Sequence, residues 1–514
     1  MSAAKKAVPT KSFMQRLLDV VEVAGNKVPH PAIIFLVLIA IVVVLSHLLY
    51  LTGASVTYQV VNPDTDEIEQ ATATARSLLT ADGIRFMFTQ VVQNFMNFNA
   101  VGVIIVAMVG VGVAEEAGLI NALIKKLVAV SPAGAITYIL VFIGIVSSIA
   151  ADAGYLVLIP LAAAAFLSLG RHPLAGLAAS FAGVAAAFGV NVMVKPLDGI
   201  LTEITNDAIH LLNPAISIDL TANFWFSFAS VILLTIVITL ITERIIEPRL
   251  GAYEGGQEVE GGGEVTAEES RGLRWTNYAL LGTLLFFALL TLPPGAPLRH
   301  PETGAIVGRS PFMDSLIVVI AVLFLAMGAA YGYGAGTMRS AVDIINAIVK
   351  TIAGLAGLIF LLLIISQFLA YFNYTNMATL AAVNLANTLQ RINLPPLLLL
   401  LGFVVVTFIL DLVITGAIPK WAIFAPIFVP LLMKLNVAPE AVLAAYRVGD
   451  SPINAISPLN AYFALIVGFA QKYQTDAGVG TGVALMLPYV AIVAVVWTIL
   501  LAVWYLLGLP WGLG

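Results

Sequence analysis

Long stretches without a charged residue dominate the chain. They include residues 31–51, 127–151, 220–242, 275–298 and 351–390. An apolar run of about 18 residues or more is long enough to cross a bilayer as a helix. The pattern therefore predicts an all-α integral membrane protein with about nine full spans, together with shorter apolar pieces that do not fit as single crossings.

The overall composition supports the same class. Of the 514 residues, 60% are hydrophobic and 10% are charged, whereas a soluble domain carries about 25% charged residues. So few charges cannot cover a soluble surface, which excludes a soluble protein with a large apolar core. The lipid bilayer is the expected surroundings.

Several functional classes are excluded or disfavoured. The net charge of −5, without a large basic cluster, argues against a nucleic-acid partner. The chain has no cysteine, and its five histidines are scattered, so neither thiol chemistry nor a histidine metal site is expected. The glycine-rich segments 110–118 and 332–336 lack the spacing of phosphate loops. We expect no enzyme, no ATP use and no cofactor other than a possible sodium ion.

Basic residues indicate the orientation. Lys5 to Arg16, the pair at 125–126 and the arginines from Arg244 to Arg274 suit the cytoplasmic side, whereas the acidic residues at 64–69 suit the outside. No small-residue cleavage site follows the first apolar run, which we interpret as a permanent helix. The expected location is a bacterial inner (plasma) membrane, crossed several times, with a cytoplasmic N-terminus.

A flexible linker is predicted at 251–270, which contains six Gly and six Glu. It separates a first half (1–250) from a second half (271–514). "HPLAGLAASFAGV" (172–184) aligns with "APEAVLAAYRVGD" (438–450). In the predicted topology the matched helices start on opposite sides of the membrane, which is an inverted repeat of the kind found in secondary transporters.

Each half contains a predicted re-entrant helical hairpin. The hairpins cover about 134–170, with "AADAG" in the middle, and about 395–436, with "DLVITGAIPKW" in the middle. A polar turn inside an apolar run cannot face lipid, because its backbone amides would have no partners. The alternative is a pair of ordinary helices joined at the surface.

A discontinuous helix follows each hairpin, at about 174–213 and about 437–472; the last span is expected at about 484–508. The breaks are "NVMVKPLDG" (191–199) and "GDSPINAISPLNAYF" (449–463), because Pro interrupts helical hydrogen bonding. Asn191 and Asn454 add side-chain oxygens to the freed carbonyls, a combination that suits sodium. The alternative is that both prolines only kink a helix.

Few ionisable residues lie inside the apolar segments, and such residues usually mark a transport pathway. They are Asp152, Lys195, Asp198, Asp411, Lys420, Arg447 and Asp450.

Their spacing leaves several roles open. Arg447 and Asp450 are three residues apart and can pair on one helix face; alternatively, Arg447 binds a substrate carboxylate and Asp450 an ion or proton. Lys195 and Lys420 either extend to water or belong to the pathway. Trp421 either stacks on an aromatic substrate or packs in the protein.

These segments resemble the p-aminobenzoyl-glutamate transporter (AbgT) family. The similarity rests on "GDSPINAISPLNAYFAL" (449–465), "WAIFAPIFVPLL" (421–432), "PEAVLAAYRVGD" (439–450) and "DAGYLVLIPLAA" (152–163). The resemblance implies nine transmembrane helices, two re-entrant hairpins and a bowl-shaped homodimer. It also implies import of p-aminobenzoyl-glutamate, or efflux of p-aminobenzoate and sulfonamide antimetabolites, driven by protons or sodium.

The resemblance implies roles for Asp198, Trp421, Pro439, Arg447, Asp450 and Pro458, and it implies sodium sites at Asn191 and Asn454. Together with the residues themselves, this gives substrate-binding candidates Trp421, Arg447, Asp450, Pro439, Pro458 and Thr415; ion-binding candidates Asn191, Asp198, Asn454 and Asp450; and weaker candidates Asp152, Ser148 and Asp411. One departure is that Ile418, Pro419 and Lys420 stand where the family often has small hydroxyl residues. Only Thr415 keeps a hydroxyl in that turn.

The leading hypothesis is therefore an ion-coupled secondary transporter of aromatic carboxylates that exports sulfonamides and p-aminobenzoate. The alternative is an importer of p-aminobenzoyl-glutamate with the same fold. An ion channel and a membrane enzyme are the rivals from other classes.

Overall fold

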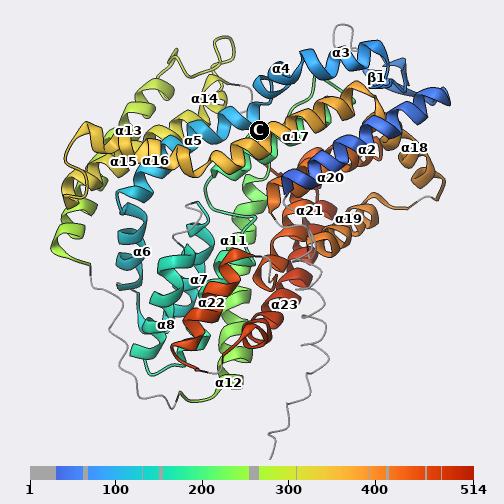
Figure 1. Cartoon of the computed structure of the whole chain (residues 1–514). Helices are drawn as coiled ribbons and strands as arrows, with labels where there is room; N and C mark the ends of the chain where they lie inside the picture. Colours follow the sequence, from blue (N-terminus) through green and yellow to red (C-terminus); the bar gives the residue numbers. More distant parts are fainter. Residues whose placement is uncertain are drawn as a thin grey trace, which may run out of the picture.

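The computed structural model describes residues 31–513, apart from 62–67, 130, 150–153, 254–264, 308–309, 393, 412–415, 458–459 and 476. Eight helices in this described part are long and apolar enough to cross a membrane, and a bent pair at 119–147 makes up to nine. The predicted all-α membrane class is confirmed. The spanning helices are α2 (Pro31–Leu51), α5 (Asn99–Glu116), α11 (Phe224–Ile241), α13 (Ala267–Thr291), α15 (Leu316–Ala335), α17 (Ala356–Tyr374), α20 (Ala417–Lys434) and α23 (Val479–Leu506) (Figure 1).

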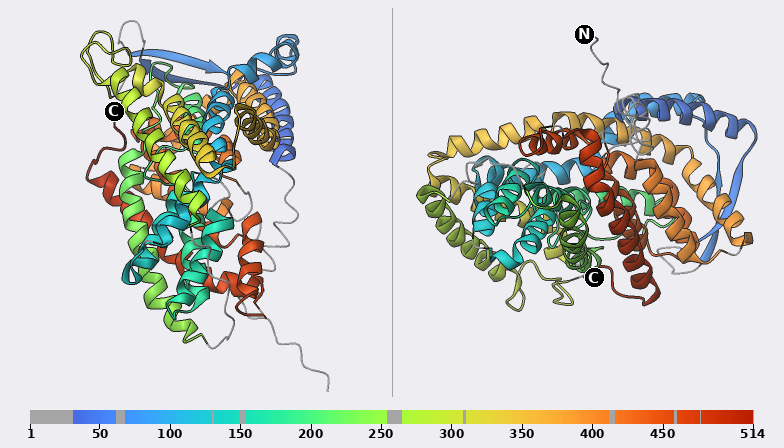
Figure 2. Two further views of the ribbon diagram at one scale, coloured as in Figure 1. Left: turned by 90° about the vertical axis from the view of Figure 1, so that its left-hand side faces the viewer. Right: turned by 90° about the horizontal axis from the view of Figure 1, so that it is seen from below.

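Shorter helices complete the fold. Those outside the two broken helices and their flanking hairpins are α3 (Ala81–Thr89), α4 (Val91–Met96), α6 (Leu119–Ala129), α12 (Glu247–Leu250), α14 (Pro311–Asp314), α16 (Ala341–Gly354) and α18 (Met377–Ile392), with short 3-10 and π turns at Ala133–Ala135 and Thr242–Ile246. Seen from below, the molecule is elongated, with α13 and α15 at one end and the strands and α18 at the other (Figure 2).

The charge-free stretch 351–390 is divided among three helices. It begins in α16, continues through α17 and ends in α18. Asn376 lies between α17 and α18 with φ of 59°, a left-handed conformation that asparagine tolerates better than most residues and that stops a helix. Hydropathy alone did not locate this turn, because the flanking residues are equally apolar.

One element was not predicted. Residues Ser55–Val61 (β1) and Ile68–Thr74 (β2) form an antiparallel two-stranded sheet. Valine, threonine and tyrosine fill β1, and such residues favour strands. The expected polar loop after the first span is therefore partly a β-hairpin at the upper end of the molecule.

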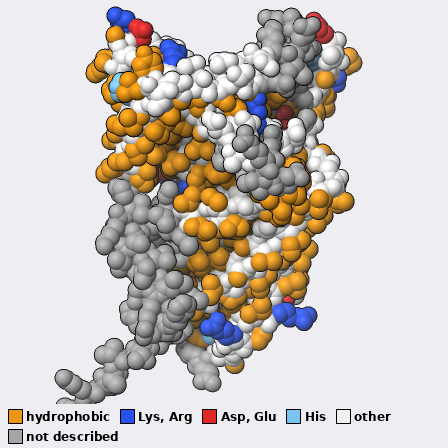
Figure 3. Space-filling model, turned by 90° about the vertical axis from the view of Figure 1, so that its right-hand side faces the viewer, with side chains coloured by type: hydrophobic (Ala, Val, Ile, Leu, Met, Phe, Trp, Pro, Cys, Tyr) orange, Lys and Arg blue, Asp and Glu red, His pale blue; other side chains and the backbone are white. Residues whose placement is uncertain are grey.

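The surface is that of a membrane protein. Apolar side chains cover its middle, and charged side chains gather toward its two ends (Figure 3). On α13, for example, Leu281 and Leu285 are more than 60% exposed. Large apolar side chains that face outward need lipid around them.

Helices α9 and α21 occupy equivalent places in the two halves. Helix α9 (Pro173–Ala185) packs against both α7 (Ile136–Ser147) and α8 (Ile159–Ser168), which follows a π turn at Gly154–Leu158. Helix α21 (Pro439–Asp450) packs in the same way against α19 (Pro396–Asp411) and α20. Both central helices start with proline at their first position. The tips of the predicted hairpins, 150–153 and 412–415, lie outside the described residues, so re-entrance stays a prediction.

Both predicted helix breaks are present. Helix α9 ends at Ala185, and α10 (Pro196–Ile209) begins only after Lys195, whose backbone is extended. Helix α21 ends at Asp450 and is followed by a 3-10 turn at Pro452–Ala455 and by α22 (Ala461–Gln471). Helix α10 packs on α20, and α22 packs on α9, so each broken helix passes from its own half to the other.

Helices α5 and α15 cross at very short distance. A Cβ atom on Gly110 would lie 1.9 Å from the backbone oxygen of Ala321, and one on Gly328 would lie 2.6 Å from the backbone of Ala114. Small residues at such crossings let helix backbones approach in membranes.

Substitution of Gly110 by alanine should therefore lower the apparent melting temperature of the purified protein. Overpacking costs about 1–3 kcal/mol, and here the clash is with backbone that cannot move aside. Gly102→Ala is the matched control on the same helix, since nothing lies within 4 Å of its added Cβ. Equal melting temperatures for the two variants would contradict the close crossing.

Candidate functional site

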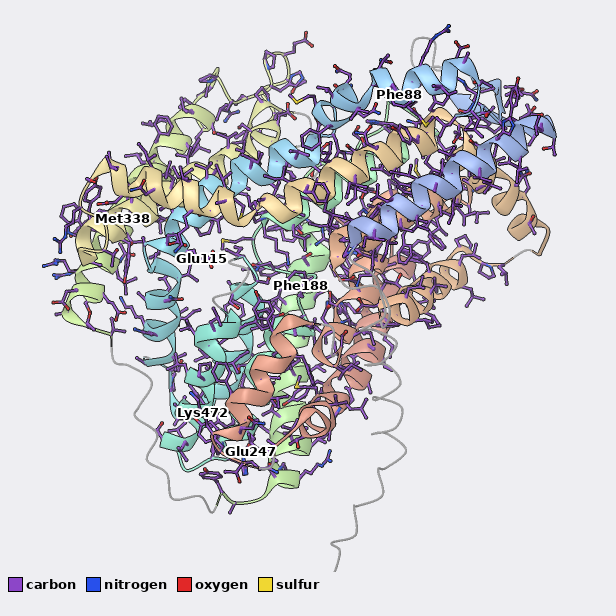
Figure 4. The ribbon with its side chains drawn as sticks, viewed as in Figure 1. Phe88, Glu115, Phe188, Glu247, Met338 and Lys472 are labelled. Atoms are coloured by element: carbon purple, nitrogen blue, oxygen red, sulfur yellow. The ribbon has the colours of Figure 1, made fainter. Side chains whose placement is uncertain are left out.

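Six buried charged side chains lie in the interior near the two breaks. They are Lys195, Asp198, Asp411, Lys420, Arg447 and Asp450, and none is more than 9% exposed. Phe188, which belongs to the first break, lies near the centre of the molecule (Figure 4). The three cations and three anions balance, as charges in a low-dielectric interior must. We call these six residues the charge cluster.

Arg447 joins the two halves. Its Nη1 donates to Asp198 Oδ1 at 2.6 Å and to the carbonyl oxygen of Gly189 at 2.8 Å, and its Nε donates to Asn223 Oδ1 at 3.1 Å. Of the two alternatives for Arg447 and Asp450, the ion pair between them does not form: Arg447 pairs with a carboxylate from the other half. The buried guanidinium is stable here because several oxygens accept hydrogen bonds from its N–H groups.

Asp198 has a second task. Its Oδ2 accepts a hydrogen bond of 2.8 Å from the backbone N–H of Lys195, so the same carboxylate caps the start of α10. A carboxylate at a helix N-terminus is stabilised by the free N–H groups there. The break at Pro196 thus positions Asp198 for Arg447.

Asp450 pairs with Lys420 rather than with Arg447. Lys420 Nζ lies 2.6 Å from Asp450 Oδ1 and also forms an ion pair with Asp411. The hydroxyl of Tyr446 donates to Asp450 Oδ1 at 3.0 Å. Lys420 is completely buried, so the alternative in which it extends to water is wrong. The lysine that departs from the family pattern is a central cation.

Lys195 is buried as well. Its ammonium group donates to the carbonyl of Phe188 and to Ser148 Oγ (3.4 Å), and lies 4.8 Å from the centre of the Phe188 ring. At 1% exposure it does not extend to water either. The first break is therefore already occupied by a cation of the protein.

Asn191 lies among backbone and hydroxyl oxygens. Its Nδ2 donates to Val146 O at 3.0 Å and to Ser148 Oγ at 3.1 Å, while its Oδ1 accepts from the backbone N–H of Met193 at 3.2 Å. The Lys195 ammonium group shares Ser148 with it. The amide oxygen keeps a second lone pair, and sodium at Asn191 stays a prediction, with the side chain of Lys195 beside it.

Asn454 is placed differently. Its Nδ2 donates to the backbone carbonyl oxygen of Asp450 at 3.2 Å, and its backbone carbonyl oxygen accepts from Asn460 Nδ2 at 2.9 Å. Asn460 in turn caps α22 through Tyr462 N. Asn454 thus holds the second break in shape next to Asp450.

Trp421 is fully buried against protein. Its Nε1 donates to Leu201 O at 3.1 Å and to Thr205 Oγ1 at 3.0 Å, and its ring lies 4.6 Å from that of Tyr446. With no exposed surface, the indole connects α20 to α10. In this conformation its role is packing, the second of the two alternatives.

The two breaks touch each other directly. The backbone N–H of Gly189 donates to Ser451 Oγ at 2.8 Å, and that hydroxyl donates to Arg447 O at 2.8 Å. A Cβ atom on Gly189 would lie 2.4 Å from Ser451 Oγ. A side chain at 189 therefore fits only if the γ atom of residue 451 moves, because the opposite break approaches so closely.

A small cavity in the described part of the chain reaches the Arg447–Asp198 pair. Its volume is about 20 Å³, and it is lined by Asn191, Met193, Val194, Asp198, Leu220, Asn223, Phe224, Ser227 and Arg447. A volume of about 10–15 Å³ already suffices for one water. An aromatic ligand does not fit into this cavity.

The remaining predicted positions are less informative. Pro439 starts α21 and orients the helix that carries Arg447 and Asp450. Asp152, Thr415 and Pro458 lie outside the described residues. Sequence reasoning missed Asn223 and Tyr446: Asn223 carries no local signal, whereas Tyr446 is adjacent to Arg447 and four residues from Asp450.

Paired charges at helix breaks inside an apolar helical protein define the class: a membrane transporter. Residues 16–514 match the model of the AbgT putative transporter family. The chain belongs to this family.

Relatives cover almost the whole chain. The p-aminobenzoyl-glutamate transport protein of Escherichia coli (strain K12) is 34% identical over 508 residues, which are 99% of this chain and 98% of that protein.

Two solved structures are similar. The YdaH transporter of Alcanivorax borkumensis has a TM-score of 0.88 and 42% identity, covering 94% of this chain and all of that one. MtrF of Neisseria gonorrhoeae, from a class of antimetabolite efflux pumps, has a TM-score of 0.90 and 38% identity, covering 97% of this chain and all of that one.

Arg447→Met should destabilise the protein strongly, because it leaves Asp198 buried and uncompensated. Breaking a buried ion pair in this way costs about 3–5 kcal/mol. Adding Asp198→Asn removes the orphan charge and keeps an oxygen that caps α10, so the double variant should recover most of the apparent melting temperature. A double variant less stable than Arg447→Met would contradict the pairing.

Proposed function

We propose that this AbgT-family protein is an ion-coupled secondary transporter of p-aminobenzoate-type aromatic carboxylates. The observation that carries the proposal is the buried Arg447, whose partner carboxylate belongs to the opposite half. A substrate carboxylate can replace Asp198 on Arg447 when the breaks separate. The name of the Escherichia coli relative supplies the substrate class.

The same exchange explains coupling. When a substrate carboxylate binds Arg447, Asp198 loses its partner, and a cation must neutralise it in a low-dielectric site. A proton fits this role, and sodium is the alternative. The lysine ammonium groups beside both breaks favour the proton, because an added sodium ion would be close to them.

Export of sulfonamides and p-aminobenzoate is the first direction we propose, supported by similarity to an antimetabolite efflux pump. Uptake of p-aminobenzoyl-glutamate is the second candidate. The proposed exchange at Arg447 favours uptake, because substrate and cation would bind together and move in the same direction. We further propose a homodimer in a bacterial inner membrane, with the N-terminus in the cytoplasm.

Expression in cells that lack their own sulfonamide pump should raise the inhibitory concentration of a sulfonamide several-fold. Arg447→Ala and Asp450→Ala should abolish this resistance. Asp82→Ala is the matched control, since Asp82 and its partner Arg85 are about three-quarters exposed and such pairs contribute little. Unchanged resistance, with Asp450→Ala equal to wild type, would reject export.

Reconstituted vesicles separate the directions and the ions. Labelled p-aminobenzoyl-glutamate is offered under independently imposed sodium and pH gradients. Proton coupling predicts a flux that follows the pH gradient and is unchanged when potassium replaces sodium. A conductance without substrate, and without saturable exchange, would instead identify a channel.

A further inference from the structure

A second, larger cavity lies along α10, away from the charge cluster. Its volume is about 260 Å³, and residues of α4, α10, α17 and α20 contribute to its wall. Its lining residues are Asn94, Asn97, Phe98, Asp207, Ala208, His210, Leu211, Ser366, Leu369, Ala370, Phe372, Asn373 and Pro426. Asn97 and His210 are exposed, whereas Phe98, Ala208 and Phe372 are buried. The cavity thus has a polar mouth and an aromatic interior.

Most polar groups at this cavity are already paired. Asn94 donates to Gln367 at 2.9 Å, and His210 is 2.9 Å from Ser217 Oγ. By contrast, the carboxylate of Asp207 and the amide of Asn373 have no hydrogen-bond or ion-pair partner in the described part of the chain. A carboxylate that is partly removed from water without a partner is unfavourable. Asp207 is therefore available to accept hydrogen bonds from a ligand.

The size and walls favour an aromatic ligand. A cavity of about 150 Å³ already binds benzene, so this cavity has room for a ring with a polar substituent. Phe98, just before α5, and Phe372, on α17, line it, and aromatic side chains pack favourably against an aromatic ring. A pocket with aromatic walls and one carboxylate suits a ligand whose aromatic ring carries an N–H donor.

We propose that this cavity binds the 4-aminophenyl end of the substrate, with the amino group donating to Asp207. The proposal rests on the proposed function, whose substrate class carries this group opposite its carboxylate. Asp207 follows Asp198 by nine residues on α10, an axial separation of about 13 Å. Nine residues are about two and a half helical turns, so Asp207 faces the opposite side of α10 from Asp198, and its cavity is a site separate from Arg447.

The location is tested first. The chain has no cysteine, so one introduced thiol is the only target for a maleimide. Ala370→Cys places it in the cavity wall, and Ile317→Cys places it in a neighbouring cavity on the other side of α10. Saturating 4-aminobenzoate should slow labelling of Ala370→Cys several-fold and leave Ile317→Cys unchanged. Equal protection of both, or of neither, would overturn the location.

The chemistry is tested by comparing the Kd of 4-aminobenzoate with that of benzoate. A hydrogen bond to a charged group contributes about 1.5–3 kcal/mol, so wild type should prefer the amine about tenfold or more. Asp207→Leu should remove this preference and Asp207→Asn should reduce it. Asp314→Asn, in the neighbouring cavity, should keep it.

The outcomes separate this site from the proposed function. If wild type transports p-aminobenzoyl-glutamate but the Asp207 variants keep the full amine preference, the cavity is not the amine site, although the proposed function stands. If wild type transports no aminobenzoyl compound in either direction, the proposed function fails. Should Asp207→Leu not fold, Asp207→Asn and the labelling experiment still decide the question.

Discussion

Six ionisable side chains lie together inside a protein whose outer surface is apolar, and five of them form ion pairs: Arg447 with Asp198, and Lys420 with Asp450 and Asp411. Lys195 instead donates to the Phe188 carbonyl and to Ser148. The pairs Arg447–Asp198 and Lys420–Asp450 need donors and acceptors from several elements at once. In a continuous helix the backbone N–H and C=O groups bond to one another. At the two breaks some of these groups are available to side chains, as the Gly189 carbonyl is to Arg447. The two breaks thus supply the backbone hydrogen-bond partners that the buried charged side chains need.

Much of this arrangement could be predicted from the sequence. Hydropathy predicted the membrane class and most spans, and proline positions predicted both breaks, since proline has no backbone N–H to donate. The charged residues at the breaks were recognised because they are rare in apolar segments. Their partners were not, since a spacing of three residues suggested Arg447 with Asp450, whereas tertiary packing supplied Asp198 from the other half. Likewise, only the fold shows that the buried Lys420 has carboxylates around it rather than a route to water.

The closed contact between the breaks has a functional consequence. The cavity of about 20 Å³ beside Arg447 has no room for an aromatic ring. In the proposed cycle the Asp198 carboxylate and the substrate carboxylate therefore alternate on Arg447, so that the buried guanidinium always has an anionic partner.

Transport by the proposed exchange requires the two breaks to separate, and a reversible crosslink tests this requirement most directly. A Cβ atom at 189 would lie 2.4 Å from the γ atom of residue 451, so a cysteine in place of Ser451 brings its sulfur within reach of a cysteine at 189, and the chain has no other cysteine. Transport by Gly189→Cys/Ser451→Cys in vesicles is measured on one sample before oxidation, after it, and after reduction. We expect oxidation to stop transport and reduction to restore it. Undiminished transport by the fully crosslinked protein would contradict the account.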